Sequence, residues 1–343
     1  MSAGWLVIRR LAAVPVSLLL LSAIVFVAVR LAPGSPVTAV AAAGASGQST
    51  ADISGDAERM GTALGLDEPL IKQYAGFLAD LSRLDLGTSI HGGTAVTTLI
   101  GQSLPATIEL AVAAMLLATA AGMCAGAVAA LRRGTWIDTA SRLAGTIGYS
   151  LPWFAPGVLG IVIFGVWLGR LPVIGRLPHD LGYRPTTGFV PVDAVLQGRP
   201  ELIGPWAGHL ILPAVTLALS LTGYLIRVVR ASMLDVLGED FVRTARMKGL
   251  APGAVLRRHV LRGAAPPVVT VLGLHFGTLL GGSVVTETVF SYPGVGNVLV
   301  NGILRRDYPV VQAASLAIGL LFVLVNVVVD LLCQMLDPRS GRA

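Results

Sequence analysis

The chain alternates between long apolar stretches and shorter charged segments. Six stretches contain no charged residue and have the length and bulk of a membrane-spanning helix, at 11–29, 110–131, 143–169, 202–226, 263–286 and 308–329. Because a helix rises about 1.5 Å per residue, stretches of this length cross a hydrocarbon core of about 30 Å. The pattern predicts an all-α integral membrane protein with six transmembrane helices, the last five at about 105–131, 143–169, 206–226, 263–286 and 308–333.

The third stretch carries prolines in its interior, at Pro152 and Pro156. A proline inside a helix removes a backbone hydrogen bond and clashes with the preceding turn. We therefore expect a bent or broken third span, with a helical lead-in from Trp136. A kink that serves packing alone and a break that lines a pathway both remain open, because unwound backbone at membrane depth must face protein or water.

The segments between spans differ in composition from the spans. Two further uncharged stretches, 31–51 and 86–108, are rich in small or polar residues and are assigned to loops, with 39–51 as a flexible tether. Apolar residues recur at helical spacing from Leu66 to Leu81, and Asp67-Glu68-Pro69 predicts the start of that helix. The proline-rich segment 170–205 predicts an irregular loop.

The composition favours lipid over water as the solvent of this surface. Hydrophobic residues make up 54% of the chain and charged residues 13%, whereas soluble domains carry about 25% charged residues. Most of the basic residues behind the net charge of +6 lie beside the apolar stretches. This placement is typical of residues that set the orientation of a membrane protein, and it favours that role over nucleic-acid binding. Cys124 and Cys333 lie in apolar runs and indicate neither a disulfide framework nor a metal site. The first stretch is too long for a signal peptide and predicts a retained span.

The distribution of Lys and Arg predicts the orientation. With the N-terminus in the cytoplasm, 15 of the 25 Lys and Arg residues fall in cytoplasmic segments, and the other ten are spread over about twice as many outer residues. Lys and Arg concentrate in cytoplasmic loops of membrane proteins. We expect both the N-terminus and the C-terminus to be cytoplasmic.

The cytoplasmic loop at 239–262 is the most informative segment. Glu239 and Asp240 suit the start of a helix, Lys248 its last turn, and Gly249 the left-handed residue that ends it. Pro252 suits the first turn of a second helix. A pair of short helices joined at a glycine can insert into a groove on a soluble partner, although a surface helix that only holds topology would look similar.

Motifs in this loop and along most of the chain resemble those of one transporter family. Residues 239–250 read EDFVRTARMKGL, which resembles the EAA coupling loop of ABC importer permeases in its dipeptide, oligopeptide and nickel branch. Further motifs of that branch are LAPGSP at 31–36, LGLDEPL at 64–70, DLGTS at 85–89, LPATIEL at 104–110, HLILP at 209–213, ETVFSYPG at 287–294, RDYP at 306–309 and LDPR at 336–339. Ser35 stands where the family usually has Asp, and Gly263 where Asn is common. The long outer segment after the first span is similar to the first, or B-type, of two paired permeases.

The resemblance implies a type I ABC importer permease in a bacterial plasma membrane, with translocation of di- or oligopeptides as its function. It implies a second homologous permease, two cytoplasmic ATPase subunits and an extracytoplasmic solute-binding protein as partners. ATP and Mg²⁺ would then bind to the ATPase subunits, and this chain would hold no cofactor or metal of its own. The implied organisation is a first span within 1–31, an extracytoplasmic segment at 32–95, a permease core at 96–335 and a tail at 336–343. The implied ATPase-coupling residues are Glu239, Asp240, Arg243, Thr244, Ala245, Lys248 and Gly249.

Polar residues and small residues at the spans are candidates for the pathway or for helix interfaces. Acidic groups in a membrane are costly and therefore functional by default, although Glu109 and Glu287 lie near the outer ends, where contacts at the interface suffice. Asp330 lies one turn from Asn326 and is expected to meet a partner helix. The Gly277, Gly281 and Gly282 cluster permits close helix approach. The candidates are Glu109, Pro152, Gly281, Gly282, Glu287 and Asp330.

Other functions are less well supported by the residues. Neither Lys72 nor Lys248 is followed by Ser or Thr, as a P-loop requires, so ATP hydrolysis by that route is excluded and the chain is not expected to be an enzyme. A stand-alone secondary transporter would need acids at mid-membrane, and an intramembrane protease would need paired catalytic groups there. Nickel chelates, glutathione and small glycans remain open as cargo, since the binding protein usually selects it.

Overall fold

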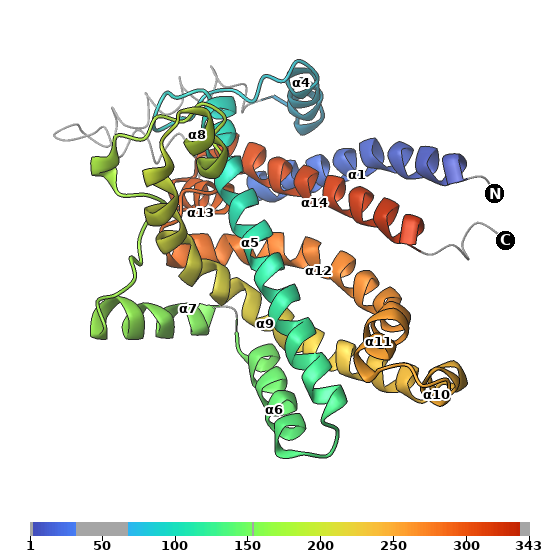
Figure 1. Cartoon of the computed structure of the whole chain (residues 1–343). Helices are drawn as coiled ribbons and strands as arrows, with labels where there is room; N and C mark the ends of the chain where they lie inside the picture. Colours follow the sequence, from blue (N-terminus) through green and yellow to red (C-terminus); the bar gives the residue numbers. More distant parts are fainter. Residues whose placement is uncertain (1–2, 32–67, 153, 337–343) are drawn as a thin grey trace.

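The computed structural model describes residues 3–31, 68–152 and 154–336, and these residues are almost entirely helical (Figure 1). The one bridge of β type in the described ranges joins Thr88 and Ala95. The predicted tether at 39–51, the first part of the LGLDEPL motif and all of the predicted tail at 336–343 except Leu336 lie outside the described residues.

Five helices are long and apolar enough to cross a membrane, and they contain five of the six predicted stretches. They are α1 (Ala3–Leu31), α5 (Val96–Leu131), α9 (Ile203–Leu237), α12 (Leu261–Val289) and α14 (Tyr308–Leu336). With lengths of 29 to 36 residues, they extend beyond a hydrocarbon core of about 30 Å at either end. The prediction of an all-α membrane protein is confirmed.

The third apolar stretch is broken. Helix α6 (Trp136–Ser150) begins at the predicted lead-in residue, and the chain resumes as α7 (Phe154–Gly160) and the π-helical η1 (Ile161–Trp167). The two halves are bent by 104°, and Pro152 lies at the break, where its missing N–H cannot continue the ladder. The bundle thus has five spans, or six if this bent pair counts as one.

Short helices connect the spans at both ends of the bundle. At one end, α10 (Asp240–Met247), α11 (Pro252–Val255) and η4 (Leu256–Val260) join α9 to α12 (Figure 1); we call this the loop end. At the opposite end lie η2 (His179–Leu181), α8 (Val190–Leu196), η3 (Pro200–Leu202) and α13 (Val295–Arg305). The prediction that 170–205 is an irregular loop is wrong in part, because hydrogen bonds to a buried carboxylate organise it around α8. The assignment of 86–108 to a loop is wrong from Val96 onward, where α5 begins.

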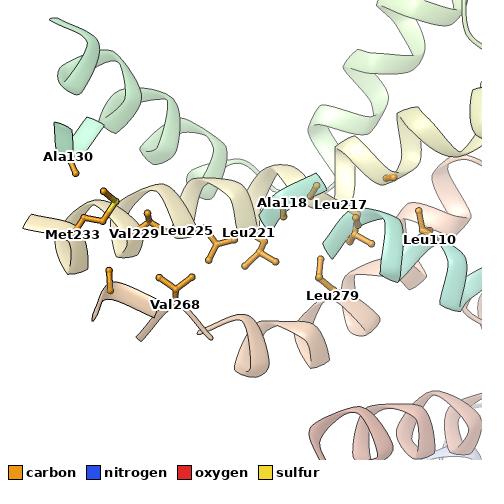
Figure 2. Close-up of a cluster of buried hydrophobic side chains, with 14 of the residues drawn as sticks. Leu110, Ala118, Ala130, Leu217, Leu221, Leu225, Val229, Met233, Val268 and Leu279 are labelled. Carbon is orange, nitrogen blue, oxygen red and sulfur yellow. The ribbon is translucent and has the colours of Figure 1, made fainter. Parts of the chain in front are cut away.

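The core lies between α5, α9 and α12, and Figure 2 shows its leucine and valine side chains meeting between these helices. Small residues on α5 bring α9 close: a Cβ at Gly122 would collide with Leu225, and one at Gly126 would collide with Val229. Helix interfaces in membranes are enriched in small residues because dispersion contacts at short range replace the hydrophobic effect. This closely packed three-helix core fixes the positions of the helix ends that carry the loop end and the opposite end.

The first and last helices pack together at the side of this core. Helix α1 contacts α14, and the predicted outer helix, observed as α4 (Leu70–Ser82), packs on α1. Tyr74 of α4 hydrogen-bonds Ser22 at 2.9 Å, while Gln73 accepts a hydrogen bond from Arg30 at 2.8 Å. The outward faces of these spans expose side chains such as Leu20 and Ile24, which suits contact with lipid.

Candidate functional site

The loop end carries the helix pair that the sequence predicts. Glu239 occupies the N-cap position of α10, Lys248 its C-cap, and Gly249 follows with a φ of +76°, in the left-handed region. Pro252 is the first residue of α11, where a missing N–H costs nothing. The geometry of a glycine-hinged helix pair is confirmed, while the coupling role of its residues stays a prediction.

One face of α10 is anchored in the core and the other is open. Val242 is fully buried and Ala245 nearly so, and both belong to the cluster that contains Met233 of α9 and Val260 of η4. Six of the seven predicted coupling residues are exposed: Glu239, Asp240, Arg243, Thr244, Lys248 and Gly249. Ala245 is the exception, because its side chain is buried in the hydrophobic cluster.

Two exposed apolar residues of α10 are absent from the sequence-based set of coupling residues. Phe241 is 49% exposed and Met247 is 73% exposed, and they accompany the charged residues on the open face. The ring of Phe241 also lies 6.4 Å from that of His259, which links α10 to the second helical segment. An apolar residue among charges on a short amphipathic helix is the signal that could have identified them, because partner grooves accept such side chains.

Near the loop end, a buried ion pair joins α6 to α9. Asp138, only 2% exposed, accepts hydrogen bonds from Arg230 Nε at 2.6 Å and from Arg230 Nη2 at 2.8 Å. The backbone N–H of Gly134 also donates to Asp138. A bidentate pair of this kind fixes orientation as well as distance. Sequence reasoning assigned both residues to cytoplasmic loops and missed their pairing.

Replacing Asp138 with asparagine is expected to loosen α6 from α9. The variant leaves the partly buried Arg230 guanidinium without its carboxylate, so the thermal midpoint of the purified protein should fall by several degrees. Differential scanning calorimetry or tryptophan fluorescence measures this. The matched control is Arg142→Ala, which removes a weaker, 3.7 Å contact from a side chain that is 54% exposed; equal midpoints for the two variants would contradict the assignment.

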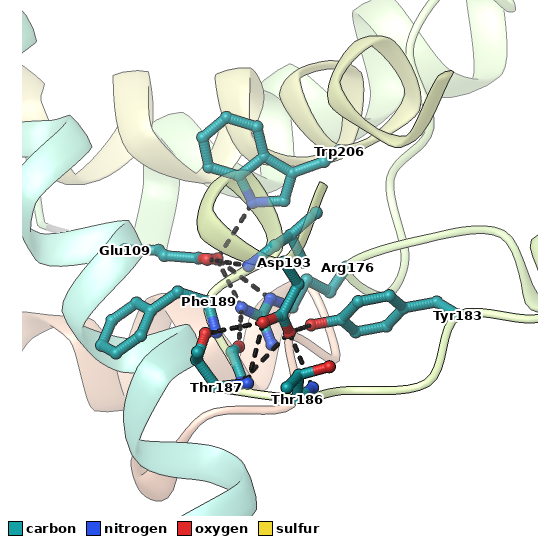
Figure 3. Close-up of polar contacts among 10 residues, drawn as sticks. Glu109, Arg176, Tyr183, Thr186, Thr187, Phe189, Asp193 and Trp206 are labelled. Atoms are coloured by element: carbon teal, nitrogen blue, oxygen red, sulfur yellow. Dashed lines mark hydrogen bonds and ion pairs between the residues drawn. The ribbon is translucent and has the colours of Figure 1, made fainter. Parts of the chain in front are cut away.

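At the opposite end, Glu109 of α5 gathers three donors that come from the 170–206 segment (Figure 3). Its carboxylate accepts hydrogen bonds from Arg176 Nε at 3.0 Å, Trp206 Nε1 at 2.9 Å and the backbone N–H of Val190 at 2.7 Å, and Arg176 Nη2 completes an ion pair at 2.7 Å. Arg176 in turn donates to the carbonyl of Gly188. Glu109 therefore anchors this segment to the core, which is more than the interface contact that the sequence suggests.

Asp193 organises the same segment from within (Figure 3). It is fully buried and accepts hydrogen bonds from the Tyr183 hydroxyl at 2.6 Å and from the backbone N–H groups of Thr186 and Thr187. Burial alone would raise the pKa of Asp193, but these hydrogen bonds outweigh it and hold the pKa well below its usual range. Because the folded pKa is lowered, the stabilisation is complete above the ordinary Asp pKa of about 4 and is lost only as the pH falls below it.

Glu287 at the end of α12 is fully buried, and its carboxylate caps α13. One oxygen accepts a hydrogen bond from the backbone N–H of Asn297 at 3.1 Å, in the first turn of that helix. Gly294 and Gly296 leave room for the carboxylate, because a Cβ at either would collide with it. An acceptor oxygen at this place satisfies a backbone N–H that has no partner within its own helix. The position indicates that Glu287 holds α13 on α12 rather than facing an open pathway.

The remaining sequence candidates fall in different surroundings. Gly281 is exposed, and a Cβ at this position would meet nothing within 4 Å, whereas Gly282 is buried in the helix interface. Gly277 allows the ring of Phe322 on α14 to approach α12 closely. Pro152 is exposed at the break after α6. Asp330 lies in α14, but its side chain is outside the described part, so its contact with a partner stays a prediction.

Comparison with known proteins agrees with this architecture. The chain is 43% identical over 314 residues to the di/tripeptide transport system permease protein DppB of Pseudomonas aeruginosa, covering 92% of each chain. It is 40% identical to the dipeptide transport system permease protein DppB of Escherichia coli K12, covering 97% of each. Among solved structures, an inward-facing MetNI methionine ABC transporter matches with a TM-score of 0.53 at 17% identity, over 70% of this chain and 97% of that one.

The structural match supports the predicted type I importer architecture for the helical bundle. At 17% identity it is evidence for the fold alone. Residues 122–342 match the family described as the binding-protein-dependent transport system inner membrane component. This range includes the α10–α11 pair and the helices α9, α12 and α14. The chain belongs to the family of binding-protein-dependent transport system inner membrane components.

Proposed function

We propose that this permease imports di- and oligopeptides as one half of a translocation pore, with a second homologous permease completing it. Two cytoplasmic ATPase subunits and an extracytoplasmic solute-binding protein complete the proposed complex. Support for peptides as cargo comes from the names of relatives that match nearly the full chain. ATP and Mg²⁺ would bind to the ATPase subunits, since the lysines of this chain lack the P-loop context.

In this proposal the loop end and both termini face the cytoplasm. The loop end carries Arg243, Arg246, Lys248, Arg257 and Arg258 within a short stretch of chain, as cytoplasmic segments do. Glu109, Asp193 and the segment they hold then face outward, where the binding protein would dock.

The observation that carries the coupling proposal is the two-sided character of α10. Its exposed face presents Phe241, Arg243 and Lys248, a mixture that suits a groove on a soluble ATPase. Its buried face contributes Val242 and Ala245 to the hydrophobic cluster that also holds Met233 of α9 and Ala264 of α12. A displacement of the helix pair therefore moves two spans directly, and closure of the ATPases on ATP would open the passage outward.

Vesicle transport tests the proposed function. Vesicles that hold the two permeases and the two ATPase subunits, supplied with the binding protein, are expected to accumulate a radiolabelled dipeptide only when ATP is present on the loop-end side. Vesicles that hold this chain alone should accumulate none, because the chain supplies no energy source. Peptide uptake by the chain alone, or no ATP-dependent peptide uptake by the full complex, would contradict the proposal.

A further inference from the structure

A pocket of about 310 Å³ lies between α6, α9 and α12, where the core helices leave a space beside the broken third span. Its walls carry four polar or aromatic residues, Tyr149, Ser220, His275 and Thr278, and its remaining lining is leucine. Tyr149 is 48% exposed, and Thr278 is exposed on the same side of α12 as Gly281, one turn further on. The pocket is thus amphipathic and open at its edge.

An aromatic and cationic array extends from this pocket toward the loop end. The rings of Tyr224 and His275 have centroids 4.6 Å apart, and those of Tyr149 and Tyr224 are 5.9 Å apart. The guanidinium carbon of Arg227 lies 4.6 Å from the centroid of the Tyr149 ring. Arg227 is exposed, so its charge stays available to a ligand while the ring faces hold it in place.

The pocket lies at mid-depth in the bundle. Tyr149 comes 13 residues after the start of α6, and His275 comes 14 residues after the start of α12, both helices starting at the loop end. At the helical rise per residue, each side chain is about 20 Å from that end. Polar groups at such a depth are expensive against lipid and are found facing protein or a water-filled cavity. A lipid-facing surface is therefore a poor explanation for four of them together.

A second pocket, on another side of α12, has a different lining. It has a volume of about 430 Å³, lies between α5, α12 and α14, and is lined by apolar side chains such as Met115, Phe276 and Leu324, with Thr119 as its one polar side chain. The contrast lies in chemistry rather than size: hydroxyl, imidazole and guanidinium groups gather on one side of α12, and methyl, thioether and phenyl groups on the other.

We propose that the pocket between α6, α9 and α12 is a contact site for the peptide on its way through the pore, a role that rests on the proposed function and specifies its path. The hydroxyls of Ser220 and Thr278 can hydrogen-bond peptide amides, the leucine walls can accept an apolar side chain, and Arg227 can meet the C-terminal carboxylate. Its volume is at the lower end for small-molecule sites, which suits one residue of a peptide with a second wall from the partner permease.

Thiol modification of the assembled complex tests this site without depending on the folding of a bulky variant. In a Cys124→Ala, Cys333→Ala background, Thr278→Cys is reconstituted and treated either with methyl methanethiosulfonate, which attaches a methylthio group through a disulfide and releases methanesulfinate, or with a bulky maleimide. Relative to the same Thr278→Cys complex before labelling, the bulky adduct is expected to lower dipeptide uptake at least about tenfold by filling the pocket, and the small adduct is expected to lower it less. Dipeptide with ATP should slow the labelling of the thiol, because the peptide occupies the same space.

Controls separate this proposal from the proposed function. Leu116→Cys, on α5 at a position where the leucine is 65% exposed and outside the pocket lining, receives the same maleimide and should keep its uptake, as should the complex without either new cysteine. Full uptake after complete labelling of Thr278→Cys would overturn the site, and so would a thiol that never reacts, which would place it in a protein interface. A complex that imports another cargo but no peptide would refute the proposed function instead. The effect of the maleimide on Thr278→Cys would then be measured as uptake of that cargo.

Discussion

Replacing Gly249 with valine is expected to lower ATP-driven peptide uptake at least about tenfold while leaving assembly of the complex intact. Gly249 has a φ of +76°, and a Cβ placed there would meet nothing within 4 Å. The penalty therefore comes from the backbone: a β-branched residue in the left-handed region costs about 1–2 kcal/mol and moves the hinge toward a right-handed conformation. The angle between α10 and α11 would then change, so that a displacement of α10 would no longer be passed on correctly to α12.

Two matched variants make this prediction specific. Gly249→Asn should retain far more uptake than Gly249→Val, because asparagine adopts left-handed dihedrals at lower cost. Gly253→Ala, four residues on, should behave like the parent, since Gly253 lies in α11 with ordinary dihedrals and open space around it. The measurements are vesicle uptake and co-purification of the ATPase subunits. Normal uptake by Gly249→Val would refute the hinge as a coupling element.

The parts of the fold that sequence predicts well are those that depend on local chemistry. The five long spans follow from the cost of charge in hydrocarbon, and the break near Pro152 follows from the missing N–H of proline. The α10–α11 hinge could be predicted to the residue because Glu239, Gly249 and Pro252 each have a strong positional preference in helices. Helix α4 could be predicted in the same way, from the helical spacing of its apolar residues and from Pro69 at its start.

The parts that sequence did not predict depend on partners distant along the chain. Asp138 and Arg230 are separated by 92 residues, and Glu109 and Trp206 by 97, so no local pattern announces either contact. The segment 170–205 looks irregular because its order comes from the Asp193 and Glu109 carboxylates rather than from periodicity. Tyr149, Ser220 and His275 were missed for the same reason: each is ordinary on its own helix, and only the packing of α6, α9 and α12 brings them to one pocket.

The Glu109→Gln variant should release the 170–206 segment from the bundle. The Arg176 side chain is only 10% exposed, and removal of the carboxylate charge leaves its guanidinium buried without a counter-ion. Breaking a buried pair in this way costs about 3–5 kcal/mol, which exceeds the cost of losing an ordinary hydrogen bond. Because the Val190 N–H donates to Glu109, its amide exchange reports the opening directly. Hydrogen exchange at Val190 is expected to accelerate about a hundredfold or more.

A double variant separates the loss of the pair from the loss of packing. Glu109→Gln combined with Arg176→Met removes both charges, so it should exchange more slowly at Val190 than Glu109→Gln alone, since no buried charge is left uncompensated. Glu201→Gln is the matched control in the same segment: its pair with Arg199 is at the surface, with a Glu201 side chain that is 54% exposed, and exchange at Val190 should not change. Unchanged protection in Glu109→Gln, or faster exchange in the double variant than in the single one, would mean that the segment is held by its apolar contacts and not by this carboxylate.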